Sequence, residues 1–224
     1  VSAAAALDGV HRVITADDIR SIVPDPYYGP VFRDQPVLAI DKVRHVGEPV
    51  ALVLAADPHI AEEGARLIIA QYDELPAVFD EVEAMTPTAA IVHDVLKPAG
   101  MFPDLKHLEG RRNTNLHLDY KLRRGDVAAA FAAADHIFEH TFHTHQVMHT
   151  PLEPLVSLAE STPTSVTIYT ASQMPSVARV IVAAILGWPE NRVRLKTAFL
   201  GGGFGAKTYI KLEALVAIAS LLVR

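Results

Sequence analysis

The residues best suited to chemistry form a glycine-rich segment, GGGFGAK at 201–207. Glycines permit positive φ and let the backbone approach a ligand closely. We expect a strand at 192–199 before this segment and a helix from about Lys207 after it. Because the first amides of a helix can bind an anion or an oxygen-rich ligand, this arrangement indicates a turn that faces a cofactor.

Three other interpretations of this segment remain open. The plain structural one is a tight turn between a strand and a helix, with no ligand. A phosphate-binding loop requires glycine directly before its lysine, where this sequence has Ala206. A dinucleotide-binding pattern is met by Gly201, Gly203 and Ala206. Its ribose-binding acid should follow about 20 residues later, beyond Arg224, and the pattern normally opens its domain.

The elements before this segment predict a small α/β domain in residues 1–83. Apolar runs suited to buried strands alternate there with capped helical segments, such as the one that Asp57 and Pro58 begin. Strands are expected at 10–15, 49–55 and 67–72, and helical segments from Ala16 and Pro58. Residues 84–116 lack sustained periodicity, which predicts a surface linker.

A second block, 117–224, is predicted to be the first, incomplete part of another α+β domain, so the fold class is α+β. Helices are expected at 127–134, 175–186 and from Lys207, and strands at 116–122, 136–147, 154–160, 165–170 and 192–199. The sequence begins with Val1 rather than Met and reaches Arg224 without a helix-ending signal. We therefore expect a fragment of a longer protein.

Composition excludes several classes of function. The formal charge of -6 and the pI near 6.0 argue against a nucleic-acid surface. With no cysteine, this chain can hold neither a disulfide nor a cysteine-bound iron–sulfur cluster, which fits a cytoplasmic location. The longest apolar stretch, 214–223, is far below the ~18 residues of a membrane span, so no span is expected.

Eight short segments carry a resemblance that covers nearly the whole chain. They are LDGV at 7–10, VITADDI at 13–19, VRHVGEPVALV at 43–53, YDELPAV at 72–78, GDVAAAFAAAD at 125–135, PLEP at 151–154, ASQMP at 171–175 and GGGFGAK at 201–207. In order and spacing they resemble the molybdopterin-binding large subunit of the molybdenum hydroxylases. This is the family of xanthine dehydrogenase, aldehyde oxidase and aerobic carbon monoxide dehydrogenase. The first four segments resemble its hammerhead domain, and the last four resemble the start of its cofactor domain.

The resemblance implies an enzyme that contains a molybdenum–molybdopterin cofactor. Such enzymes hydroxylate a carbon centre of an N-heterocycle, a purine or an aldehyde with oxygen from water. Electrons leave through iron–sulfur clusters and FAD, which would lie on partner subunits or domains, and the complete enzyme is expected to be an oligomer. The family's catalytic glutamate lies beyond Arg224, so no catalytic residue and no metal ligand is expected here, and the chain alone should be inactive. The alternatives are a non-catalytic assembly module and a dinucleotide-binding domain that uses Gly201 and Gly203.

By resemblance, the cofactor-binding residues of this chain are Gly202, Gly203, Phe204 and Gly205. Their amides would face a metal oxo group or a pterin oxygen, and the phenyl ring of Phe204 would form a wall on the substrate side. Amides held in such positions stabilise developing negative charge without reorganising.

The sequence departs from the family's pattern at two positions. Many xanthine-oxidising members have glutamate directly after the lysine of the motif, where this chain has Thr208, which argues against a purine substrate. Many members place a glutamine two residues before the equivalent of His149, where this chain has Val147. Gln146, one place earlier, is the candidate substitute for that cofactor contact.

Other polar residues are expected to have structural roles. His143 and His145 could share one face of a strand as metal ligands, but carboxylates at ligand spacing are lacking, so an ordinary strand is expected. Glu153 lies between apolar residues and is expected to form a structural hydrogen bond. Ser172 and Gln173 could orient a loop near the pterin, but a cap for the helix at 175–186 is the preferred interpretation.

Overall fold

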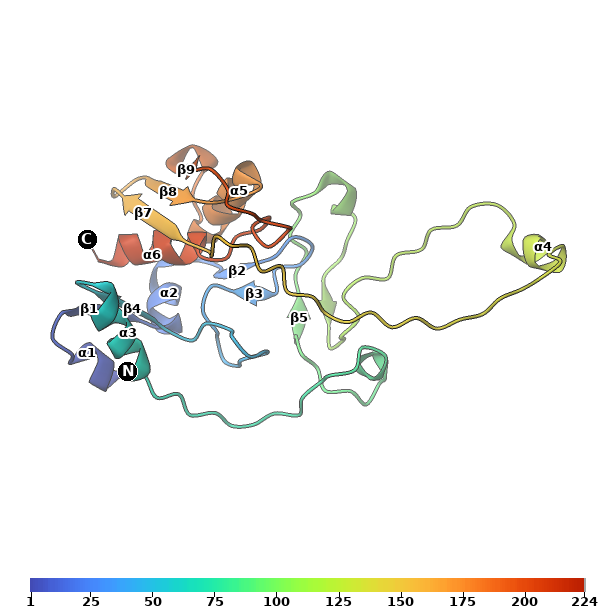
Figure 1. Ribbon diagram of the computed structural model, residues 1–224, viewed down its shortest axis with the longest axis horizontal. Coiled ribbons are helices and arrows are strands. Elements are labelled where there is room, and N and C mark those ends of the chain that lie inside the picture. The colour runs from blue at the N-terminus through green and yellow to red at the C-terminus, as the bar shows by residue number, and fades with distance from the viewer. Residues whose placement is uncertain (224) are drawn as a thin grey trace.

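The computed structural model describes residues 1–223, and its fold is α+β with a packed body and one long excursion (Figure 1). The body contains residues from both ends of the sequence. The excursion, residues 117–150, runs out from the body to a single short helix and returns (Figure 1). We call residues 117–150 the arm.

The first block of the body is built around an antiparallel strand pair. β1 pairs with β4, and the helix that follows β4 is capped by Asp57, whose carboxylate accepts the amides of His59 and Ile60 at 2.8 and 3.0 Å. Thr15 and Asp18 form a capping box at the start of α2. The elements are α1 (Ser2–Ala5), β1 (Val10–Ile14), α2 (Ala16–Ile22), β2 (Tyr27–Tyr28), β3 (Gln35–Pro36), β4 (Leu52–Ala55) and α3 (Pro58–Arg66).

Residues 84–116, the expected linker, contain short elements. β5 pairs with β6, and Asn115 ties the segment together by donating to the carbonyls of Ala84 and Ala90 and accepting the amide of Val92. The elements are η1 (Glu83–Met85), β5 (Val95–Leu96), η2 (Pro103–Leu105) and β6 (Arg111–Arg112).

The second block contains a three-stranded sheet in the order β7-β8-β9. β7 and β8 are antiparallel, whereas β8 and β9 are parallel and are joined through α5. Gly187 ends α5 in the left-handed conformation, at φ 65°. The elements are β7 (Ser157–Ser161), β8 (Val166–Thr170), α5 (Pro175–Leu186), η3 (Glu190–Arg192), β9 (Val193–Thr197) and α6 (Glu213–Leu222).

The two blocks of sequence share one hydrophobic core. Ile14, Ile19 and Leu38 from the first block belong to the same buried cluster as Ile168 and Ile218 from the second. The guanidinium of Arg12 also donates to the carbonyl of Leu222 at 2.9 Å, across 210 residues of sequence. The first block therefore packs directly against the sheet and α6 of the second.

Four element predictions were wrong. Residues 67–72, 116–122 and 136–147 are not strands, and α6 begins at Glu213 rather than near Lys207. The three segments have side chains that suit a half-buried strand, but residues 1–223 offer them no neighbouring strand, so their backbone has no ladder to join. The predicted helix also reached Arg224, which lies outside the described residues.

The remaining element predictions were confirmed, with shifts of a few residues at their ends. Of the arm, only α4 (Val127–Ala132) is regular, and Asp126 caps it by accepting the amide of Ala129 at 3.0 Å. Strand 154–160 is observed as β7, three residues later at its start. Across residues 1–223, none of the helices has the length and apolar character of a membrane span.

Candidate functional site

The glycine-rich segment is an irregular turn between β9 and α6. Gly202, Phe204 and Gly205 have φ values of 95°, 51° and 96°, so three residues of the segment adopt the left-handed region. Glycine enters this region without strain, but a phenylalanine rarely does. We refer to residues 201–207 as the glycine turn.

The middle of the glycine turn presents unused backbone donors. Within residues 1–223, the amides of Gly202, Gly203 and Phe204 donate no hydrogen bond. The ring of Phe204 is 73% exposed, while Gly203 is buried. Successive amides in a turn of alternating φ form a concave site for an anion or an oxygen atom, so this is the chemistry that the turn offers.

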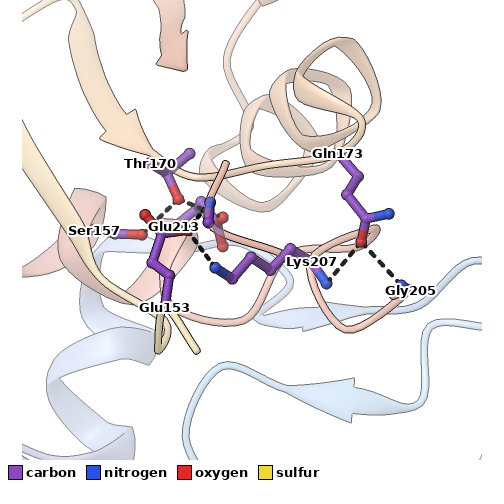
Figure 2. A network of polar contacts seen from close by, with 8 residues as sticks. Glu153, Ser157, Thr170, Gln173, Gly205, Lys207 and Glu213 are labelled. Atoms are coloured by element: carbon purple, nitrogen blue, oxygen red, sulfur yellow. Dashed lines mark hydrogen bonds and ion pairs between the residues drawn. The ribbon is translucent and has the colours of Figure 1, made fainter. Parts of the chain in front are cut away.

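One end of the glycine turn is fixed by Glu153, from the segment just before β7. The carboxylate accepts the amide of Gly201 at 2.9 Å and the ammonium of Lys207 at 2.5 Å (Figure 2). These two contacts, that to Lys207 first, lower the pKa of Glu153 below its usual range. The side chain of Lys207 is fully buried, so Glu153 is the group that compensates its charge.

The other end is fixed by Gln173, between β8 and α5. Its side-chain oxygen accepts the backbone amides of Gly205 and Lys207 at 3.1 and 3.2 Å (Figure 2). The backbone amide of Gln173 donates to the carbonyl of Lys207 at 2.9 Å. The preferred interpretation of Gln173 as a helix cap was therefore wrong. Met174 is the N-cap residue of α5, without a side-chain cap bond, and the hydroxyl of Ser172 accepts the amide of Met174 at 3.2 Å.

Gln173 also explains why α6 begins later than expected. The carbonyl of Lys207 accepts the backbone amide of Gln173. The amide of Lys211, which would donate to that carbonyl in a helix, donates to the carboxylate of Glu213 instead. A topological signal could have located Gln173. It follows β8 and the glycine turn follows β9, and since these strands are parallel and adjacent, both segments lie at the same sheet edge.

A buried carboxylate adjoins the glycine turn at the start of α6. Glu213 is 4% exposed, and it accepts the hydroxyl of Thr170 at 2.9 Å and the amides of Lys211 and Leu212 at 2.8 and 3.1 Å. Since the Thr170 hydroxyl donates to Glu213, the Ser157 hydroxyl, 2.8 Å away, donates to Thr170 (Figure 2). This chain of hydrogen bonds, which we call the relay, joins β7, β8 and α6.

The chain before β7 lies along the glycine turn. A Cβ atom built on Gly205 would lie 3.6 Å from Nε2 of His149, and one on Gly202 would lie 3.4 Å from Cβ of Pro151. Gln146, three residues earlier, is exposed, and within residues 1–223 it forms no hydrogen bond to the turn. The structure thus brings Gly202, Gly203, Phe204 and Gly205 together and does not bring Gln146 to them.

Two other ligand interpretations, a dinucleotide site at the glycine turn and a metal site among the histidines, can be compared with the structure. The dinucleotide pattern needs a helix that opens at its third small residue, Ala206, but residues 206–212 are not helical. The histidine segment at 140–149 is an exposed, irregular part of the arm. In the described part of the chain there is no group of three or more His, Cys, Asp or Glu side chains that could hold a metal ion.

Both halves of the chain match domains of known protein families. The a/b hammerhead domain of aldehyde oxidase and xanthine dehydrogenase matches residues 1–76, and the molybdopterin cofactor-binding domain matches residues 108–224. The gamma subunit of the 6-hydroxypseudooxynicotine dehydrogenase complex of Paenarthrobacter nicotinovorans is 32% identical over 219 residues, which are 93% of this chain and 25% of that protein. The carbon monoxide dehydrogenase large chain of Hydrogenophaga pseudoflava is 33% identical, over 99% of this chain and 27% of that one.

A solved structure agrees with these matches. The aldehyde oxidoreductase of Desulfovibrio gigas superimposes with a TM-score of 0.81 at 26% identity, over 98% of this chain and 23% of that one. The chain therefore spans about a quarter of the length of these three proteins. Because the cofactor-domain match alone covers more than half of the chain and includes the glycine turn, the chain belongs to the molybdopterin cofactor-binding family, with the hammerhead domain of aldehyde oxidase and xanthine dehydrogenase before it.

Proposed function

We propose that this chain supplies the hammerhead domain and the first part of the cofactor domain of a molybdenum hydroxylase. The observation that carries the proposal is the set of unused amides at Gly202, Gly203 and Phe204, inside the matched cofactor domain. In this proposal they hold the molybdenum–molybdopterin cofactor, together with Gly205. Gln146 would join them only after a movement of the arm.

The residues of the glycine turn fit such a group. Backbone N–H donors suit the oxygen atoms of a pterin or of a metal oxo group. Phe204 holds an exposed ring in a left-handed conformation, which costs of order 1–3 kcal/mol and is typical of ligand-binding segments. In the bound enzyme that ring would form part of the substrate wall.

The cofactor, when bound, supplies the chemistry of the proposed reaction, which is hydroxylation of a carbon centre with oxygen from water. This chain's residues would bind and orient it and exclude water from one side. Because the chain has no cysteine, the iron–sulfur clusters that take up electrons would lie on partner subunits or domains, with FAD beyond them. A cytoplasmic location and an oligomeric complete enzyme belong to the same proposal.

The substrate class is a carbon centre in an N-heterocycle, a purine or an aldehyde. The relatives that match this chain are named for 6-hydroxypseudooxynicotine, carbon monoxide and aldehyde, although each of them matches more than nine tenths of this chain. This supports a shared cofactor site whose substrate is selected by other residues. Many xanthine-oxidising members have glutamate after the motif lysine, and Thr208 in that place favours a substrate other than a purine.

The test is metal analysis of the natural gene product, purified with any subunits that remain bound to it. We expect molybdenum in near-stoichiometric amount and oxidation of at least one compound in a screen of N-heterocycles, aldehydes, purines and carbon monoxide. The isolated residues 1–224 should retain much less molybdenum. A gene product without molybdenum, or one that binds NAD at the glycine turn instead, would overturn the proposal.

A further inference from the structure

The two ends of the glycine turn are fixed in the same way. At residue 201, the side chain of Glu153 accepts the Gly201 amide at 2.9 Å and the Glu153 amide donates to the Gly201 carbonyl at 3.2 Å. At residue 207, the side-chain oxygen of Gln173 accepts the Lys207 backbone amide at 3.2 Å, and the Gln173 backbone amide donates to the Lys207 carbonyl at 2.9 Å. Each reciprocal pair fixes one backbone residue, and the unused amides lie between them.

The buried Lys207 joins the two fixed ends. Its backbone bonds to Gln173, while its ammonium reaches across the turn to Glu153 (Figure 2). The turn is therefore a closed unit in which one lysine connects both clamping side chains. Such closure limits the conformations that the free backbone can adopt before a ligand binds, and this reduces the entropy that binding costs.

Two of the glycines are explained by these side chains rather than by a ligand. A Cβ atom on Gly201 would lie 2.6 Å from Cβ of Glu153, and one on Gly203 would lie 2.5 Å from Oε1 of Gln173. Both distances are too short for real atoms, so any larger residue would displace the clamping side chain. Gly202 and Gly205, by contrast, are required for their positive φ.

We propose that Gln173 and Glu153 are positioning residues that hold the amides of Gly202, Gly203 and Phe204 ready for the cofactor. The inference rests on the proposed function and adds two residues to it. Gln173 is suited to this position because its amide oxygen accepts two backbone donors without placing a charge beside the turn. Neither residue needs to touch the cofactor.

The test compares Gln173→Met, which removes the acceptor, with Gln173→Glu, which keeps an acceptor of the same length. Two quantities are measured in the natural gene product, namely amide hydrogen exchange in residues 205–207 and molybdenum per polypeptide. In Gln173→Met we expect faster exchange in residues 205–207. We also expect about tenfold less molybdenum when the cofactor concentration lies below Kd, because the affinity for the cofactor falls about tenfold. Gln173→Glu should keep slow exchange and retain more molybdenum than Gln173→Met. Gln71→Met, the same change at an exposed residue, is the matched control.

Gly203→Ala provides a second route if Gln173→Met does not fold. Its new methyl group would push Oε1 of Gln173 away from the turn without changing the glutamine, so the same two effects are expected. Unchanged exchange, or faster exchange with full molybdenum content, would overturn the positioning role while the proposed function stands. Absence of molybdenum from the unaltered protein would overturn the proposed function and this inference together.

Discussion

The glycine turn and the arm are both irregular, but they differ in what holds them. The turn is bonded at both ends, and its Lys207 side chain is fully buried. The arm is exposed throughout, and Leu122 and Phe142 are 81% and 85% exposed. The segment that would meet a cofactor is thus fixed by contacts within the body, whereas the arm's apolar side chains remain largely exposed within residues 1–223. The body should therefore be sensitive to substitution where the arm is not.

The largest expected effect is in the shared core. Ile218 in α6 is fully buried in the cluster that joins the two blocks. Ile218→Ala should lower the free energy of unfolding by about 2–5 kcal/mol, because the body loses apolar contacts and retains a cavity. Urea denaturation measures this loss. A loss below about 1 kcal/mol would mean that the shared core is not what holds the body together.

The next effect concerns the buried Glu213. Thr170→Val keeps the shape of the side chain but removes the hydroxyl that donates to the carboxylate. We expect a loss of about 1.5–3 kcal/mol, the range for a hydrogen bond to a charged group. Thr167→Val is the matched control, since Thr167 lies on the other face of β8 and is less buried. Equal losses in the two variants would show that the relay adds no stability.

Ionisation of Tyr28, which lies in β2 of the body, should lower the free energy of unfolding at alkaline pH. Burial, and then the nearby carboxylates of Glu213, Glu48 and Asp34, raise the pKa of Tyr28 from 10.0 to about 12. Its stabilising contribution is therefore complete below pH 10 and lost as the pH rises toward 12, by at most about 2.7 kcal/mol. Tyr28→Phe should flatten the curve of unfolding free energy against pH between pH 10 and 12. An unchanged slope would assign the alkaline loss to other groups.

The sequence predicted the elements of the body better than those of the arm, because several elements of the body depend only on residues close together in sequence. The helix that Asp57 caps, the helix expected at 175–186 and the strand expected at 165–170 depend on neighbours in sequence, and all three are observed. Gly187 ends the second helix in the left-handed conformation, and β8 alternates buried and half-buried residues. The segment at 116–122 has a similar alternation, and 136–147 was also expected to be a strand. A strand also needs a partner, which residues 1–223 do not provide for either segment. Alternation reports which face could be buried, not whether anything buries it.

The candidate site was predicted in part. The resemblance located the glycine turn, and the expected structural hydrogen bond of Glu153 is observed. The helix expected from Lys207 does not begin there, because the lysine's carbonyl accepts the backbone amide of Gln173, 34 residues away in sequence. No local pattern reports a contact of that kind, since it arises only when β8 and β9 lie side by side. The contacts between Gln173 and the turn were therefore visible only in the fold.

The smallest expected effect is on the arm, and it tests the comparison most directly. Phe142 is already 85% exposed, so Phe142→Ser changes little in the contact of the folded chain with water. We expect a change within about 0.5 kcal/mol in residues 1–224, measured by urea denaturation. Phe79, 95% exposed in the irregular segment after α3, is the matched control for the same substitution. If Phe142→Ser instead costs more than about 2 kcal/mol in the natural gene product and Phe79→Ser does not, the arm is buried there by structure outside residues 1–223. The contrast between the turn and the arm would then hold only for this part of the protein.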